Sequence, residues 1–315
     1  MKKKKTHRKE NLQIVNPHAA GIDIGSQSHF VAVAPHLTDD NVREFGCFTS
    51  DLLCIADWLK SENITAVAME STGVYWIPLF EILESKGFEV KLVNARHVKN
   101  VPGRKKTDRL DCQWIQKLHS FGLLRGSFHP EGKIRGLRCY LRHRENLVKT
   151  SGQHIQHMQK SLQQMNILLH NVISDITGVT GMLIISAICE GEEDPKKLAR
   201  FRDKGCKNSE EVIEESLRGN YQEEHIFSLK QSLEGWRFCQ TQMIECDSKI
   251  EAHLENFGSK SINTNTPPKS KGDKKRKNQL NFDVNLEVHR ITGVDLSKVA
   301  GFDGNIIMRI ISETG

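Results

Sequence analysis

The chain has 315 residues, a formal net charge of +6 and a hydrophobic content of 37%. This composition can build a folded core, and no apolar stretch is long enough to span a membrane. The 8 cysteines are scattered without a Cys-x-x-Cys pair, which argues against a zinc ribbon, a redox motif or a disulfide scaffold. We therefore expect a reduced, cytoplasmic protein of about two domains, without membrane contact and with an anionic partner.

Residues 1–17 are polar and include four consecutive lysines, Lys2 to Lys5, so they are predicted to form a disordered basic tail. Residues 18–130 alternate strand and helix patterns. Strands are expected at residues 20–25, 29–34, 42–48, 64–69 and 88–93, and helices at 50–59, 74–86 and 107–121. Three strands followed by alternating helices and strands is the order of the RNase H fold. We therefore predict an α/β domain of RNase H-like (resolvase-like) type.

Four acidic residues stand at the ends of these predicted elements. Asp23 ends the first strand in Gly-Ile-Asp-Ile-Gly, and Glu70 ends the fourth in Met-Glu-Ser-Thr-Gly. Asp108 and Asp111 open the last helix and are three residues apart, so they lie on one face. Four carboxylates gathered together repel one another unless a cation lies between them. Oxygen ligands of this kind suit Mg²⁺, and the pattern predicts a metal site for chemistry on phosphodiesters.

Each motif alone has another interpretation. Asp-Ile-Gly at Asp23 also opens the phosphate loop of actin-like and hexokinase-like ATPases, but the second Asp-x-Gly-Gly loop of that fold does not occur. Glu70 alone fits a capping or surface residue. Asp108 and Asp111 alone fit a helix start, where negative charge is favourable. Their joint occurrence, in this order on these elements, favours the metal site.

Residues 131–258 change to a helical pattern with apolar residues at alternating three- and four-residue steps. One run extends from Ile134 to Ile176, with Arg144 and Ser151 as polar interruptions. A second extends from Ile226 to Phe257, with Gln240 and Asp247 in the same register. Such heptads predict an all-α coiled-coil region, paired within one chain, between chains or both. An ordinary packed helical bundle is the alternative.

Residues 259–281 are rich in Asn, Thr, Pro and Lys, and predict a flexible basic linker. Residues 282–315 are expected to start a helical C-terminal domain. Basic residues also surround the Asp pair and line the first long helix. The candidates for nucleic-acid contacts are Lys105, Lys106, Arg109, Arg135, Arg138 and Arg142.

The motifs Gly-Ile-Asp-Ile-Gly, Met-Glu-Ser-Thr-Gly-Val-Tyr-Trp and Lys-Thr-Asp-Arg-Leu-Asp together resemble those of the DEDD-type insertion-sequence transposases, the bridge-RNA-guided recombinases. The resemblance implies a resolvase-like N-terminal domain, a coiled coil and a C-terminal transposase domain. It implies that Asp23, Glu70, Asp108 and Asp111 bind Mg²⁺ as a catalytic tetrad in DNA transposition and recombination. It also implies a structured RNA encoded by the element and a homo-oligomer assembled through the coiled coil.

The family also uses a serine nucleophile in a Ser-Gly-Gly-like stretch, and neither Ser297 nor Ser312 matches it. We therefore expect a C-terminally truncated transposase that is inactive alone. Two other functions stay open: a stand-alone Mg²⁺-dependent nuclease or resolvase, which would use water and need no serine, and a non-catalytic DNA-binding or dimerisation fragment.

Overall fold

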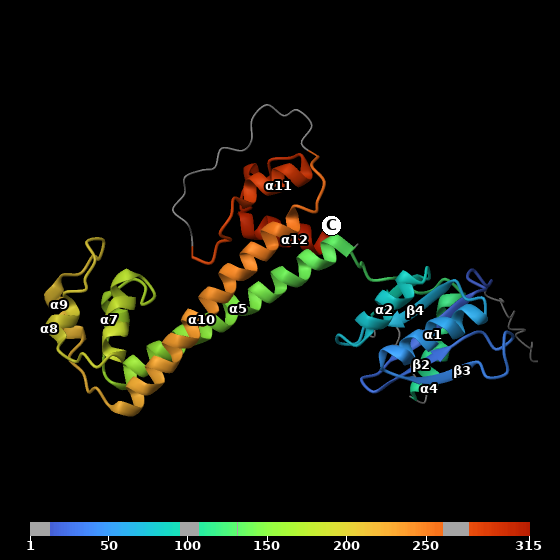
Figure 1. The fold of residues 1–315 in the computed structure, drawn as a ribbon, viewed down its shortest axis with the longest axis horizontal. Helices are drawn as coiled ribbons and strands as arrows, with labels where there is room; N and C mark the ends of the chain where they lie inside the picture. The colour runs from blue at the N-terminus through green and yellow to red at the C-terminus, as the bar shows by residue number, and fades with distance from the viewer. Residues whose placement is uncertain (1–12, 95–106, 131, 261–276) are drawn as a thin grey trace, which may run out of the picture. The chain divides into compact units, whose positions relative to one another are not determined.

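A computed structural model describes residues 13–94, 107–130, 132–260 and 277–315 in two compact units, Met1–His129 and Pro130–Gly315 (Figure 1). Most of the predicted tail and linker, together with Lys105 and Lys106, lies outside the described residues. No helix in the described ranges is long and apolar enough to cross a membrane.

The Met1–His129 unit is built on a five-stranded mixed sheet with the strand order β3-β2-β1-β4-β5. Its strands are β1 (Ala19–Ile24), β2 (Ser28–Ala32), β3 (Val42–Gly46), β4 (Ala66–Glu70) and β5 (Glu89–Val93). The first three strands are antiparallel, whereas β1, β4 and β5 are parallel. The predicted order of strands and helices is therefore present, and the carboxyl ends of β1 and β4 lie at one edge of the sheet.

Helices cover both faces of this sheet. The helices α1 (Thr49–Ser61) and α2 (Trp76–Ser85) pack on one face, where Ile22, Ile24 and Met69 belong to the main hydrophobic core. The helix α4 (Asp108–Ser120) packs on the other face, where Ile115 contacts Ala68 and Val93. The first predicted helix begins one residue earlier than expected, because Asp51 accepts a hydrogen bond from the Phe48 backbone N–H at 3.1 Å.

The helix α4 lies unusually close to β1 because Gly21 has no side chain. A Cβ atom at Gly21 would lie far inside the van der Waals distance of the Gln116 nitrogen and the Cys112 oxygen, both backbone atoms. Polar side chains of α4 complete the attachment: the Gln116 amide donates to the Ala19 carbonyl at 3.2 Å, and His119 Nδ1 is 3.3 Å from the Ala20 carbonyl. The position of Gly21 thereby fixes where the first turn of α4 lies.

Two buried histidines make the stability of this unit depend on pH. Burial lowers the pKa of both His29 and His119 below the usual 6.5, and each side chain is 2% exposed. The unfolded chain therefore binds protons more readily than the folded one. The resulting stability is fully present above about pH 6.5 and is lost as the pH falls toward the folded-state pKa values.

We expect the free energy of unfolding of this unit to decrease between about pH 7 and pH 5. Urea titrations followed by tryptophan fluorescence measure this decrease, in a Trp236→Phe background that leaves only the tryptophans of this unit. His119→Gln should flatten the pH profile, whereas the exposed control His36→Gln should leave its slope unchanged. An unchanged slope in His119→Gln would contradict the assignment.

The regular elements of the Pro130–Gly315 unit are all helices within its described residues. Two long helices, α5 (Gly132–Gln164) and α10 (Glu223–Leu254), lie antiparallel and side by side (Figure 1). Between them in the sequence come α6 (Leu169–Val172), α7 (Val179–Cys189), α8 (Pro195–Ala199) and α9 (Glu210–Ser216), which share a core with one end of the pair. The helices α11 (Val284–Thr292) and α12 (Gly304–Thr314), with the short 3₁₀ helix Leu296–Lys298, pack against the other end.

The polar interruptions of the two heptad runs pair with each other. Arg144 forms a buried ion pair with Asp247, and the Gln240 amide donates to the Ser151 hydroxyl at 3.1 Å. Ser151 follows Arg144 by seven residues on α5, and their partner Gln240 precedes Asp247 by seven residues on α10. A single antiparallel register therefore satisfies both pairs, and pairing within one chain is the arrangement that the structure contains.

The first heptad run does not form one continuous helix to Ile176, as its pattern predicts. The helix α5 ends at Gln164, because Asn166 adopts a left-handed backbone with φ 55° and the Ile167 N–H returns to the Leu162 carbonyl at 2.9 Å. The apolar residues beyond this turn still reach the core, from α6 and the loops beside it. The spacing of these apolar residues therefore indicated that they are buried, and did not indicate that one helix continues through them.

Candidate acidic site

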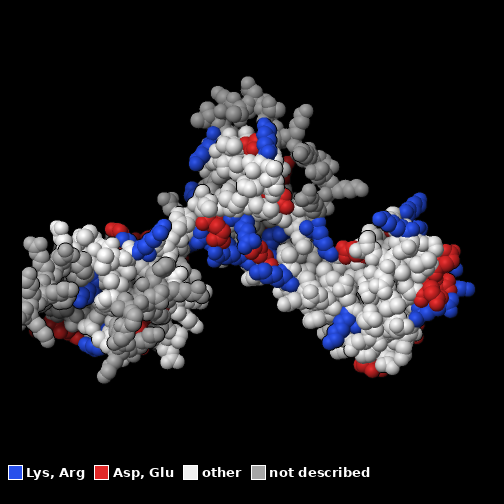
Figure 2. Space-filling model, turned by 180° about the vertical axis from the view of Figure 1, so that it is seen from behind, with Lys and Arg blue, Asp and Glu red and all other residues white. Residues whose placement is uncertain are grey.

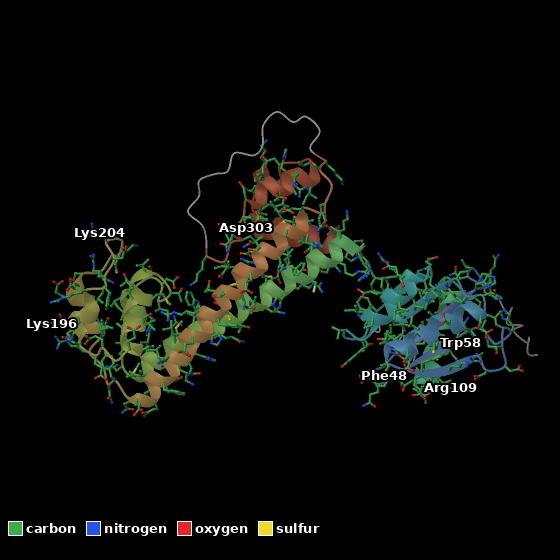
Figure 3. The ribbon with its side chains drawn as sticks, in the orientation of Figure 1. Phe48, Trp58, Arg109, Lys196, Lys204 and Asp303 are labelled. Carbon is green, nitrogen blue, oxygen red and sulfur yellow. The ribbon has the colours of Figure 1, made fainter. Side chains whose placement is uncertain are left out.

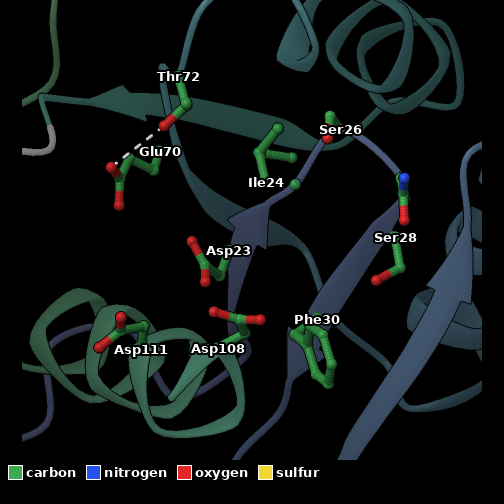
Figure 4. Close-up of a pocket in the computed structure, with 11 residues that line it drawn as sticks. Asp23, Ile24, Ser26, Ser28, Phe30, Glu70, Thr72, Asp108 and Asp111 are labelled. Carbon is green, nitrogen blue, oxygen red and sulfur yellow. Dashed lines mark hydrogen bonds between the residues drawn. The ribbon is translucent and has the colours of Figure 1, made fainter. Parts of the chain in front are cut away.

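All four predicted carboxylates line one pocket of 410 Å³ in the Met1–His129 unit. They enter it from three elements: Asp23 from the end of β1, Glu70 from the end of β4, and Asp108 and Asp111 from the first turn of α4 (Figure 4). In that view Asp23 lies between Glu70 and the two aspartates of α4. The structure therefore brings together residues that lie far apart in the sequence.

Strand alternation explains why the carboxylates of β1 and β4 face the same way. Ile22 and Met69 are paired positions of the two parallel strands, and both point into the core under α1 and α2. The next residue on each strand, Asp23 and Glu70, must point to the opposite face, which is the face of α4. Thr107 caps α4 by accepting a hydrogen bond from the Leu110 N–H at 3.3 Å, so the helix begins beside these two side chains.

Glu70 is buried and is oriented by neighbouring groups. Its side chain is 2% exposed, and its Oε1 accepts a hydrogen bond from the Thr72 hydroxyl at 3.2 Å. The strand end that carries it is fixed by Ser71, whose backbone N–H and hydroxyl both donate to the Val93 carbonyl on β5, at 3.0 and 3.2 Å. The buried carboxylate is thereby oriented by groups that follow it directly in the sequence.

Asp23 also acts electrostatically on α4. Burial raises the pKa of the Cys112 thiol to about 12, and the negative charge of Asp23 adds to this increase. The thiol of Cys112 is therefore protonated at neutral pH rather than an anionic thiolate. Its Sγ donates instead to the Arg109 carbonyl at 3.2 Å within the first turns of α4.

The donor set of the pocket has the chemistry that a hard divalent cation requires, because all four candidate ligands are carboxylates. Within the described residues, however, no three acidic, histidine or cysteine side chains already stand close enough together to hold a metal ion. Mutual repulsion favours this spread, and Glu70 is turned toward Thr72. The pocket fits a cation in its ligand types, and binding would require its carboxylates to turn toward one another.

The predicted nucleic-acid-binding residues lie in different surroundings. Arg109 is exposed on α4 beside Asp108 (Figure 3). Arg135 is half-buried on α5. Arg138 and Arg142, also on α5, are engaged by Glu313: Arg142 donates to both carboxylate oxygens at 3.0 and 2.9 Å, and Arg138 Nε lies 3.3 Å from one of them. Figure 2 shows Lys and Arg side chains over the α5–α10 pair, with acidic side chains among them.

Four polar residues of the pocket were not among the sequence candidates. They are Ser26 and Gln27 from the turn between β1 and β2, Ser28 from the start of β2, and Thr72. A Ser-Gln-Ser turn directly after the motif of Asp23 is the signal that could have found three of them, because a tight turn keeps its residues at the strand end. Thr72 is two residues beyond Glu70 and could have been found in the same way.

Fold and pocket together define an α/β protein with an acidic site at the carboxyl ends of its parallel strands. Residues 20–167 match the family model of the IS110-type DEDD transposases, whose description is transposase. The family generally uses divalent metal ions. No match to a curated protein was found.

Proposed function

We propose that the chain works in DNA transposition of an insertion sequence, with Asp23, Glu70, Asp108 and Asp111 as the Mg²⁺-binding tetrad for DNA strand cleavage and transfer. One observation carries this proposal: four carboxylates from three elements line a single pocket inside the stretch that matches the family. Their order along the chain, Asp-Glu-Asp-Asp, agrees with the DEDD designation.

The fold supports an RNase H-like assignment for this unit. Its first three strands are antiparallel neighbours, and β4 and β5 extend the sheet in parallel, in the order of three strands followed by alternating helices and strands that is expected for this fold. The acidic pocket lies at the carboxyl ends of the parallel strands, where α/β sheets commonly place their sites.

Bound Mg²⁺ would supply positive charge to stabilise the phosphodiester oxygens during strand cleavage. The protein's own contribution is orientation. Glu70 is fixed by Thr72 and by the end of its strand, while Asp108 and Asp111 are placed by the contact between α4 and β1. Mg²⁺ is proposed over other divalent ions because carboxylates and water are its usual ligands beside phosphate substrates.

DNA is the proposed substrate, and an element-encoded structured RNA and a second copy of the chain are the proposed partners. The RNA and the homo-oligomer rest on the family resemblance. Arg109 supports a phosphate contact beside the pocket, because it is exposed next to Asp108. For Arg138 and Arg142, a nucleic-acid contact would compete with Glu313.

The test is strand cleavage by the wild-type protein and by Asp23→Asn, Glu70→Gln and Asp108→Asn. A supercoiled plasmid that carries the genomic flanks of the gene, with RNA transcribed from those flanks, serves as substrate in Mg²⁺. Each isosteric change removes one charge, and we expect cleavage to fall on the order of a hundredfold or more. Asp57→Asn, an exposed aspartate of α1 outside the pocket, is the matched control.

Cleavage that survives in all three pocket variants would contradict the proposal, provided that Asp57→Asn behaves as the wild type. No cleavage by the wild type would agree with the expectation that the chain is inactive alone. The proposal then depends on Mn²⁺ binding, and equal Mn²⁺ binding by the wild type and Asp23→Asn would contradict it. Nicking without joining of strands, lost in Asp23→Asn, would instead favour the nuclease or resolvase function.

A further inference from the structure

The acidic pocket has a second wall that carries no charge. It is formed by the turn between β1 and β2 and the first residue of β2, which contribute Gly25, Ser26, Gln27 and Ser28 to the lining (Figure 4). The Gly25 N–H donates to the Ser28 carbonyl at 3.1 Å, which closes the turn. A Cβ atom at Gly25 would collide with that same carbonyl, so the tight turn requires glycine here. The backbone that carries these hydroxyls and the amide is therefore fixed at the end of β1, and their residues line the same pocket as Asp23.

The hydrogen-bonding groups of this wall are available to a ligand. Ser26 and Gln27 are exposed and Ser28 is half-buried. Across the described ranges of the chain, none of these three side chains has a hydrogen-bond partner within the protein. By contrast, the hydroxyl of Thr72 on the other side of the pocket is committed to Glu70.

The charge of the pocket determines which ligand such a wall suits. A phosphodiester brings a negative charge toward four carboxylates, so its oxygens need hydrogen-bond donors that do not themselves compete for a cation. Hydroxyl and amide groups are such donors, and they are common contacts to phosphate oxygens in nucleic-acid complexes. The side chains of Ser26, Gln27 and Ser28 are the ones in the pocket lining that offer donors not already used inside the protein.

We propose that the Gly25–Ser28 turn is the subsite that binds the phosphate backbone of the nucleic-acid strand next to the carboxylates, through the side chains of Ser26, Gln27 and Ser28. This inference deepens the proposed function and rests on it. In this arrangement the carboxylates bind the cation, and the Gly25–Ser28 turn binds the nucleic-acid strand.

The test is the affinity of the full chain for a fluorescein-labelled single-stranded DNA of about 20 nucleotides and for an RNA of the same sequence. Fluorescence anisotropy is measured in Ca²⁺ in place of Mg²⁺, since Ca²⁺ also binds oxygen ligands but with a looser geometry. Loss of two hydrogen bonds in Ser26→Ala/Ser28→Ala should weaken binding of both strands about tenfold. Gln27→Ala should weaken it in the same direction.

Two controls separate this subsite from the metal site and from damage to the fold. Ser85→Ala changes an exposed serine of α2 that lies outside the pocket, and should bind as the wild type. Calorimetric titration with Mn²⁺ should give the same affinity in the wild type and in Ser26→Ala/Ser28→Ala. Single phosphates of the DNA are also replaced by neutral methylphosphonates. At one position this replacement should lower the DNA affinity of the wild type more than that of Ser26→Ala/Ser28→Ala, because the methylphosphonate and the double substitution remove the same contact.

The outcomes separate the two proposals. Wild-type affinity in both Ser26→Ala/Ser28→Ala and Gln27→Ala overturns the subsite, while loss of Mn²⁺ binding in Asp23→Asn would still support the proposed function. Weakening for RNA alone also overturns it, because the contact would then be to the 2′-hydroxyl and not to phosphate. A wild-type chain that binds neither strand overturns the subsite, and if it also binds no Mn²⁺ the proposed function fails with it.

Discussion

Gly21→Ala is expected to destabilise the Met1–His129 unit by about 3 kcal/mol or more, because the new methyl group has no room. It would collide with backbone atoms of Cys112 and Gln116, and no rotation of a side chain can relieve that. The whole of α4 would have to move away from β1. Because α4 carries Asp108 and Asp111, the same change should weaken divalent-metal binding even in molecules that stay folded.

Urea unfolding followed by tryptophan fluorescence in the Trp236→Phe background measures the first effect, and Mn²⁺ titration measures the second. Gly152→Ala, followed by circular dichroism at 222 nm because the Trp236→Phe background does not report on its unit, provides a matched control of opposite sign. Gly152 lies within α5 with nothing within 4 Å of an added Cβ, so the change should stabilise the other unit by up to about 1 kcal/mol through helix propensity. A Gly21→Ala protein of wild-type stability would show that α4 does not depend on this close approach.

Arg144→Met is expected to cost the Pro130–Gly315 unit about 3–5 kcal/mol, because it leaves the buried carboxylate of Asp247 without its partner. The guanidinium also joins a third segment to the helix pair. It donates to the carbonyls of Asn278 and Gln279, each at 3.1 Å, while Asp247 accepts from the Asn281 N–H at 3.1 Å. One ion pair therefore holds α5, α10 and the segment that leads into α11.

The double variant Arg144→Met/Asp247→Leu should recover much of this loss, since it leaves no buried charge unpaired. Thermal unfolding monitored by circular dichroism at 222 nm gives the comparison. Additive losses in the double variant would mean that the two side chains act independently, and would contradict the ion-pair account. Arg218→Met, which breaks exposed pairs with Glu214 and Glu215, is the control and should have little effect.

The acidic site was largely predictable from the sequence, since each carboxylate follows an apolar strand or opens a helix. Element order and strand alternation were enough to bring Asp23 and Glu70 to one edge. The uncharged wall was not predicted. Ser26 and Ser28 are ordinary polar residues in the sequence, and only the tight turn at Gly25 and the pocket lining identify them as part of the site. The spread of the carboxylates could not be predicted either, because it depends on side-chain rotation.

The helical unit shows a different limit of sequence reasoning. The heptad spacing predicted the two long helices but left open whether they pair within or between chains. The structure shows one arrangement, pairing within the chain, in which Arg144 with Asp247 and Ser151 with Gln240 fit a single register. The pattern also ran past the true end of α5, because apolar residues beyond Asn166 are buried from a turn and a short helix.

Calorimetric titration of the wild type and Asp23→Asn with Mn²⁺ and Mg²⁺ tests most directly whether the four pocket carboxylates form one metal site. The account predicts saturable binding in the wild type, an affinity at least about tenfold lower in Asp23→Asn, and wild-type binding in Asp57→Asn. Equal binding by the wild type and Asp23→Asn, or no binding by the wild type at millimolar metal, would contradict it.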